Sequence, residues 1–160
     1  MSMSKKINLK KTLVEKILDR ANIPYESLKL NALSTNELPD GILRSDIYKT
    51  LALSGDKTGP IIGILPLDEH LSEKKFAKIS GNKKVTMIPQ RDLQKTTGYI
   101  HGANNPVGIH QTKHFPIFID NIALKKETIY VSAGELGRSI KIDPRQLATF
   151  IDAKFTDIKE

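Results

Sequence analysis

The residues best suited to binding chemistry lie in a glycine-rich stretch at residues 97–108. This stretch contains three glycines, two adjacent asparagines and a proline. Glycine and asparagine permit sharp bends that leave backbone N–H groups exposed, and such groups can bind an anion or a developing oxyanion. The sequence therefore predicts a binding loop, with a glycine-rich connection that binds no ligand as the alternative.

A second chemical feature is Lys49, which lies in a predicted strand at residues 47–53. Strand side chains alternate between two faces, so Lys49 shares its face with the apolar residues Ile47, Leu51 and Leu53. An ammonium group on an apolar face is costly unless it has a partner. We expect it to extend to solvent at an edge, to pair with a carboxylate, or to face a cleft where an anionic ligand contacts it.

The chain offers no evident protein nucleophile or metal site. It has no cysteine, which excludes a cysteine nucleophile and a thiolate metal site. Ser132 lacks the glycine two residues earlier that a hydrolase elbow requires. His110 and His114 are four residues apart, but the nearby Pro116 argues against a helix there.

No cofactor is predicted, because neither a G-x-G-x-x-G motif after the first strand nor a Walker A motif occurs. Exposed amides, hydroxyls and one unusual lysine are the chemical groups that remain. This inventory suits a reaction in which the substrate supplies its own nucleophile and the protein supplies position and electrostatics.

Three short motifs occur in order along the chain. They are YKTL at residues 48–51, TGYIHG at residues 97–102 with G-x-x-x-P at residues 102–106, and IYVSAG at residues 129–134. Together they resemble the motifs of the YbaK/EbsC family of free-standing aminoacyl-tRNA deacylases. The resemblance extends from about residue 13 to residue 158 and includes KFTDI at residues 154–158. Three ordered motifs are more specific than any one of them.

The resemblance implies an enzyme that removes a mischarged amino acid, characteristically cysteine, from proline tRNA. It assigns catalytic roles to Lys49 and to the backbone of Gly102 at the scissile ester. It assigns substrate binding to the other motif residues, Thr50, Ile100, Pro106, Ser132 and Gly134. In this family a cysteinyl ester is thought to be cleaved by its own thiol, which closes to a thiolactone. Alanyl or seryl esters would instead require a positioned water.

Two loop segments depart from the family pattern. Ala103, Asn104 and Asn105 replace the commoner run of small residues before the motif proline, and Glu135 and Leu136 stand where a basic pair is usual.

Positive charge is concentrated in two blocks of a chain whose formal net charge is +7. Residues 1–16 carry five lysines and one glutamate, and residues 73–95 carry seven basic and two acidic residues. Such blocks can attract RNA by releasing its condensed counterions, although solvated helix faces are an alternative. We expect mischarged tRNA as a partner, with prolyl-tRNA synthetase as a further candidate. The competing interpretations are a non-catalytic RNA-binding module of the same fold and a scaffold that acts through a synthetase.

The length and the apolar spacing predict one α+β domain over residues 1–160, with residues 1–8 flexible. Helices are expected at residues 13–21, 72–80, 90–97 and 144–151, and strands at residues 27–30, 47–53, 61–65, 84–88, 115–119, 128–131 and 139–142. The family resemblance implies that the strands form a mixed, barrel-like sheet with flanking helices. No window matches a membrane span or a signal peptide, so a cytoplasmic monomer is expected.

Overall fold

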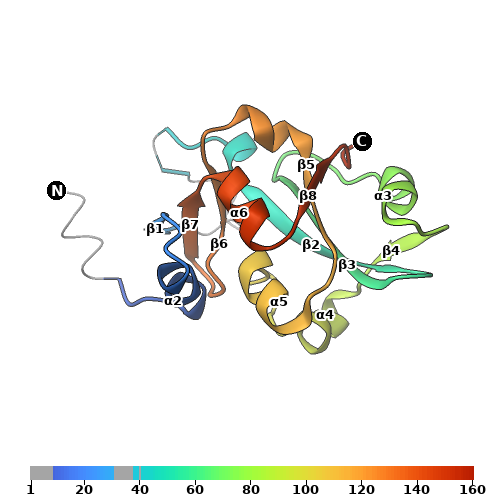
Figure 1. The fold of residues 1–160 in the computed structure, drawn as a ribbon, viewed down its shortest axis with the longest axis horizontal. Coiled ribbons are helices and arrows are strands. Elements are labelled where there is room, and N and C mark those ends of the chain that lie inside the picture. Colours follow the sequence, from blue (N-terminus) through green and yellow to red (C-terminus); the bar gives the residue numbers. More distant parts are fainter. Residues whose placement is uncertain (1–8, 31–37, 40) are drawn as a thin grey trace.

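Two open β-sheets form the framework of the computed structural model, which describes residues 9–30, 38–39 and 41–160 (Figure 1). The small sheet is antiparallel and has the order β1 (Glu26–Lys29), β7 (Arg138–Ile142) and β6 (Ile129–Ser132). The large sheet has the order β4 (Val85–Met87), β2 (Tyr48–Gly55), β3 (Gly59–Pro66), β5 (Ile117–Asp120) and β8 (Lys154–Thr156). Its pairs are antiparallel on both sides of β2 and parallel on both sides of β5, so the predicted mixed α+β fold is confirmed. The flexibility expected for residues 1–8 lies outside the described residues.

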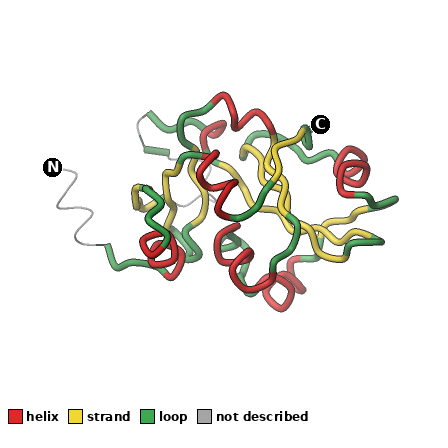
Figure 2. The backbone as a smooth tube through the Cα atoms, viewed as in Figure 1, coloured by secondary structure: helices red, strands yellow, loops and turns green. Residues whose placement is uncertain are grey.

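Helical segments lie on several sides of the strands (Figure 2). The α-helices in the described residues are α2 (Leu13–Arg20), α3 (Glu73–Ser80), α4 (Gln90–Thr97), α5 (Pro106–Lys113) and α6 (Pro144–Phe150). Two short 3-10 helices, η1 (Arg44–Asp46) and η2 (Asn121–Lys125), precede β2 and follow β5. Of the helices described, none has the length and apolar character needed to cross a membrane.

The β2–β3 hairpin carries the two hydrophobic cores on its opposite faces. It is paired along its whole length, from Tyr48 opposite Pro66 to Gly55 opposite Gly59. One face contributes to a large core with α2, α5, α6 and the small sheet, and the other face packs against α3. The residues of the hairpin in the large core are Tyr48, Ala52, Ile62 and Ile64, and those in the smaller core are Leu53, Ile61 and Leu65.

The two sheets do not close into a barrel within the described residues. β4 pairs with β2 only over residues 53–55, and the small sheet meets β2 through a single bridge between Ile47 and Tyr130. A barrel requires continuous pairing around its circumference. Because β4 is only three residues long, it cannot extend along β2 to meet the small sheet. The expected barrel-like sheet is therefore open along residues 48–51 of β2.

Helix α5 corrects the expectation that Pro116 excludes a helix around His110. Asn105 caps the helix, Pro106 occupies the first helical position, and the chain leaves the helix at His114 with φ +57°. Proline is well tolerated in the first turn, where its missing N–H has no helical partner to bond. Pro116 lies beyond the helix end and obstructs nothing.

Strand β8 was also not predicted as an element from the apolar pattern.

The C-terminal segment is tied to the large sheet by Asp120. Its buried carboxylate accepts hydrogen bonds from the backbone N–H groups of Ile122 at 3.0 Å, Ile158 at 2.9 Å and Lys159 at 3.2 Å. Lys159 Nζ lies 3.3 Å from the same carboxylate. The Asp120 carboxylate therefore satisfies one backbone amide of η2 and two backbone amides of the segment after β8.

We expect Asp120→Ala to lower the free energy of unfolding by about 2–4 kcal/mol, because it leaves buried amides without an acceptor. Urea denaturation measures this loss. Asp157→Ala is the matched control. It removes a half-exposed carboxylate of the same C-terminal segment, which pairs with Lys75 of α3. A loss in the control as large as that of Asp120→Ala would contradict this account.

Candidate active site

A cavity of about 300 Å³ opens where the two sheets part. Its wall combines the unclosed stretch of β2, the β4–α4 segment, the glycine-rich loop after α4, and β6 and β7 of the small sheet. The residues that line it are Ile47, Tyr48, Lys49, Thr50, Leu51, Ala52, Leu67, Met87, Ile88, Gln90, Leu93, His101, Gly102, Asn104, Val131, Ser132 and Ser139. The same lack of strand pairing that prevents a closed barrel thus creates the cavity.

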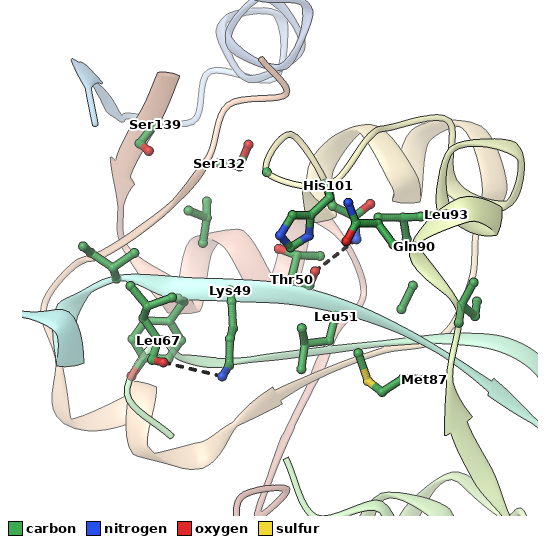
Figure 3. A pocket seen from close by; sticks show the side chains of 17 residues that line it. Lys49, Thr50, Leu51, Leu67, Met87, Gln90, Leu93, His101, Ser132 and Ser139 are labelled. Atoms are coloured by element: carbon green, nitrogen blue, oxygen red, sulfur yellow. Dashed lines mark hydrogen bonds between the residues drawn. The ribbon is translucent and has the colours of Figure 1, made fainter. Parts of the chain in front are cut away.

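The ammonium group of Lys49 is held by backbone carbonyls. Nζ donates to Glu69 O at 2.6 Å and lies 3.5 Å from Leu67 O, just after β3 ends. In Figure 3 the side chain extends toward Leu67, while His101 and Gln90 lie on the opposite side of β2, over Thr50. Of the three arrangements expected for Lys49, the third agrees with its position in the lining of a cavity, and the contacts with carbonyls were not expected.

Burial lowers the pKa of the Lys49 ammonium, and the nearby positive charge of Arg44 lowers it further. The carboxylates of Asp68 and Glu69 oppose this shift. The amine is half-buried, so its charge is screened less by water than that of an exposed lysine. Lys49 therefore places a weakly screened cation at one side of the cavity.

The glycine-rich loop bends at both of its first two glycines. Gly98 ends α4 in the left-handed region with φ +90°, and Gly102 has φ +92°. Such φ values favour glycine, because a Cβ atom would crowd the backbone. Across the first bend, Thr97 Oγ1 accepts a hydrogen bond from Tyr99 N at 3.1 Å. These turns bring His101, Gly102 and Asn104 to the cavity wall.

The adjacent asparagines of this loop have different contacts. Asn105 is fully buried, and its Oδ1 accepts from Gly108 N at 2.7 Å while Nδ2 donates to Ala103 O at 3.1 Å. Asn104 reaches across to β2, where Nδ2 donates to Thr50 O at 3.0 Å. Asn105 thus caps α5, and Asn104 anchors the loop to the open edge of the sheet.

Unpartnered polar atoms are concentrated at the cavity. Across the described residues, four buried side-chain polar atoms have no hydrogen-bond partner, and three of them belong to cavity residues: Tyr48 Oη, Thr50 Oγ1 and Asn104 Oδ1. Buried polar groups are normally satisfied, since leaving one unpaired costs about 1–3 kcal/mol. Burial also raises the pKa of the Tyr48 phenol, aided by Asp120 and Asp46, so the phenol is a neutral donor. Three residues of the cavity wall therefore carry buried polar atoms that are unsatisfied within the described part of the chain.

The second glycine loop follows β6. Ser132 Oγ lines the cavity and accepts a hydrogen bond from Gly134 N at 3.1 Å. Gly134 itself has φ +92° and is not among the lining residues. A Cβ added there would lie 3.1 Å from Val14 Cγ2 and 3.3 Å from Asn105 Nδ2. Gly134 thus allows close contact between this loop, α2 and the cap of α5.

The structure brings together four of the seven predicted site residues, since Lys49, Thr50, Gly102 and Ser132 all line the cavity. The other three do not line it. Ile100 is exposed in the glycine loop, Pro106 is buried in the first turn of α5, and Gly134 packs against α2. The roles of all seven stay predictions.

Several lining residues were not singled out from the sequence, among them Gln90, His101, Asn104 and Ser139. His101 and Asn104 lay inside the recognised loop, and for Asn104 the departure from a run of small residues was the available signal. His110 and His114 lie outside the lining, and their rings pack edge to face at 5.4 Å. No group of three or more potential His, Cys, Asp or Glu ligands for a metal occurs in the part of the chain that is described.

A model of the aminoacyl-tRNA editing domain matches residues 39–150, which include every lining residue. The chain belongs to this family. The match confirms the resemblance seen in the three motifs. Each motif supplies residues to the cavity: the first Lys49 and Thr50, the second Gly102 and Asn104, and the third Ser132.

Two relatives place this editing domain in different settings. The chain is 35% identical over 162 residues to an Enterococcus faecalis protein named "Putative Cys-tRNA(Pro)/Cys-tRNA(Cys) deacylase EbsC", with 98% of each chain covered. It is 29% identical over 128 residues to a proline–tRNA ligase of Thermodesulfovibrio yellowstonii, covering 79% of this chain and 21% of the ligase. This chain thus resembles both a protein matched over almost its whole length and one segment of a synthetase.

Solved structures share the fold of this editing domain. "Crystal structure of hypothetical protein APE2540" matches with a TM-score of 0.79 at 20% identity, covering 92% of this chain and 99% of that one. "Crystal structure of a putative trans-editing enzyme for prolyl tRNA synthetase" matches with a TM-score of 0.72 at 19% identity, covering 85% and 87%.

The packing of Gly134 can be tested against Gly137 in the same loop. Both have positive φ, but a Cβ at Gly137 would meet nothing within 4 Å. Gly137→Ala should cost about 1 kcal/mol from backbone strain alone. Gly134→Ala should cost about 1–3 kcal/mol more, because Val14 and the cap of α5 must shift. Equal changes in the free energy of unfolding, measured by urea denaturation, would exclude the packing role.

Proposed function

We propose that this editing domain is a trans-editing deacylase, and that its most suitable substrate is cysteinyl-tRNA(Pro). The observation that carries the proposal is the meeting of Lys49, Thr50, Gly102 and Ser132 in one cavity with unpartnered polar atoms. The similarity to the E. faecalis protein supports the substrate class, because it extends over 98% of both chains.

The reaction that suits this cavity uses a nucleophile from the substrate. The lining includes hydroxyls but no cysteine, and among the described hydrogen bonds Ser132 Oγ is joined to Gly134 N rather than to a histidine base. The cysteinyl thiolate attacks its own ester carbonyl, which forms the C–S bond of a thiolactone. The C–O ester bond breaks, and the 3′-oxygen of the tRNA takes up a proton. Hydrolysis of the thiolactone then gives free cysteine.

The protein's part in this step is electrostatic and positional. Gly102 is proposed to turn the loop so that backbone donors lie near the carbonyl oxygen. Lys49 is proposed to stabilise negative charge on the terminal nucleotide or on the departing oxygen. Because Lys49 points to the side of β2 opposite His101, the lysine and the loop act on different parts of the substrate in this proposal.

Exposed basic residues occur in the chain segment from α3 to α4, part of which lines the cavity. Lys74, Lys78, Lys83, Lys84 and Arg91 are exposed in this segment. Gln90, directly before Arg91, lines the cavity. These cations are proposed to hold the phosphates of the acceptor stem. Prolyl-tRNA synthetase is a proposed partner, since a segment of one such ligase is similar to this chain.

The function is tested with purified protein and tRNA(Pro) charged with cysteine, serine, alanine or proline, each scored by the rate of ester loss. Cysteinyl-tRNA should lose its ester at least 10-fold faster than the seryl ester, relative to the uncatalysed rates, because only cysteine carries the thiol. Transient thiolactone should be detectable by mass spectrometry. Faster loss of the alanyl or seryl ester would indicate a positioned water instead, and binding without ester loss would indicate a non-catalytic RNA-binding module.

Lys49→Ala should lower kcat/KM for cysteinyl-tRNA about 100-fold or more, because it removes the cation of the cavity. Lys49→Arg should recover part of this loss by retaining the charge. Lys57→Ala is the matched control, since Lys57 is an exposed lysine at the other end of the same hairpin. Circular dichroism and thermal unfolding check that the variants fold. Wild-type kcat/KM in folded Lys49→Ala would refute the role of the lysine.

A further inference from the structure

The carboxamide of Asn104 is only half satisfied. The residue is 7% exposed, and its Nδ2 donates to Thr50 O at 3.0 Å. Its Oδ1 is buried in the cavity wall and has no hydrogen-bond partner in the described part of the chain. The neighbouring Asn105, by contrast, uses both ends of its carboxamide within the loop. Capping therefore explains Asn105 and leaves the orientation of Asn104 Oδ1 unexplained.

The orientation of this carboxamide is fixed by its partner. Thr50 O is a carbonyl, which can only accept hydrogen bonds, so the NH₂ end of Asn104 must face it. A flipped side chain would place two acceptors against each other. Asn104 Oδ1 is therefore held as an acceptor, and only a hydrogen-bond donor can satisfy it.

Thr50 contributes a second buried atom that can accept a hydrogen bond. Its Oγ1 is also buried without a partner, and it belongs to the residue whose carbonyl anchors Asn104. A threonine hydroxyl can accept two hydrogen bonds. Two acceptor atoms from contacting residues suit a donor with several N–H groups, and a charged donor strengthens both bonds. Lys49 is not that donor, because its side chain extends from the opposite side of β2 toward the carbonyls of Leu67 and Glu69.

We propose that Asn104 Oδ1 and Thr50 Oγ1 bind the α-ammonium group of the aminoacyl ester. Asn104 is then a specificity residue that selects esters with a free α-amine and disfavours esters whose α-nitrogen is absent or acylated. This inference rests on the proposed deacylase function. It explains why asparagine occupies a loop position where small residues are commoner, since aspartate lacks the N–H that binds Thr50 O and leucine lacks both groups.

The test compares two RNA minihelices, one with a 3′-cysteinyl ester and one with a 3′-(3-mercaptopropionyl) ester, which keeps the thiol and lacks the α-amine. Each enzymatic rate is divided by the uncatalysed rate of the same ester, because the amine also changes ester reactivity. The wild-type protein should favour the cysteinyl ester at least 10-fold in kcat/KM. Asn104→Leu should reduce this preference to below about 3-fold, mainly by slowing the cysteinyl ester. An unchanged preference would overturn the proposal.

Two further variants keep the test decisive if Asn104→Leu folds poorly. Thr50→Val removes Oγ1 but retains the carbonyl that anchors Asn104, and it should also lower the preference. Gln111→Leu replaces an exposed amide of α5 outside the cavity lining, and it should keep the wild-type preference. Thermal unfolding identifies variants that do not fold. Wild-type preference in folded Thr50→Val, together with poor folding of Asn104→Leu, would count against the proposal.

The 2′-hydroxyl of the terminal ribose is the other donor near the ester. A cysteinyl minihelix ending in 2′-deoxyadenosine distinguishes the two donors when its rate is compared with that of the ribo-terminated minihelix. If the wild-type protein favours the ribo-terminated minihelix and Asn104→Leu does not, Oδ1 binds the ribose, and the α-ammonium proposal is overturned.

Failure of the deacylase function itself is recognised separately by absence of turnover with the cysteinyl ester. In that case calorimetry with the corresponding 3′-amide analogues measures the same preference. Equal affinities for analogues with and without the α-amine would then reject the role of Asn104.

Discussion

The open edge of β2 is the constraint on which the site depends. β4 pairs with the end of this strand and the small sheet meets its beginning, so the edge between them must find other partners. Unpaired strand edges are costly when buried and invite other chains when exposed. Here the side chain of Asn104 binds Thr50 O in place of a neighbouring strand, which fixes the glycine-rich loop over the gap. Closing the edge with a longer β4 would satisfy the backbone and remove the cavity.

The same strand separates two different electrostatic environments. Alternation along β2 sends Lys49 toward the carbonyls of Leu67 and Glu69 and leaves Thr50 beside Asn104. One side of the strand therefore presents a cation, and the other presents buried acceptors. A ligand that carries opposite charges at its two ends matches this arrangement better than a uniformly charged one. An aminoacyl ester on RNA has that character, with an ammonium near the ester and phosphates beyond the ribose.

Local rules were sufficient to predict most elements of the fold from the sequence. The ends of α3 and α4 follow from Gly81 and Gly98, which adopt the left-handed conformation that such positions favour. Helix α5 was missed because its N-cap and first-turn proline lie in a stretch that also reads as a loop, although Asn105 followed by Pro106 is a helix start. The open sheets could not be predicted, since strand alternation does not specify which distant strands pair along an edge.

For the candidate site too, the features that depend on neighbouring residues could be predicted from the sequence, and the contacts with distant residues could not. The anomaly of Lys49 is visible from alternation alone, but its carbonyl partners come from 18 and 20 residues away and depend on how the chain leaves β3. Gly134 lies in a motif that includes a lining residue, Ser132, yet the structure uses its missing Cβ for packing against α2. Motif membership therefore does not separate contact with ligand from support of the loop. Unpartnered buried atoms are a better guide, since three of the four in the described residues belong to cavity residues. A module that only held RNA phosphates at its surface would gain nothing from the buried, unpaired Oγ1 of Thr50 and Oδ1 of Asn104, whereas a cavity that recognises a small donor requires them.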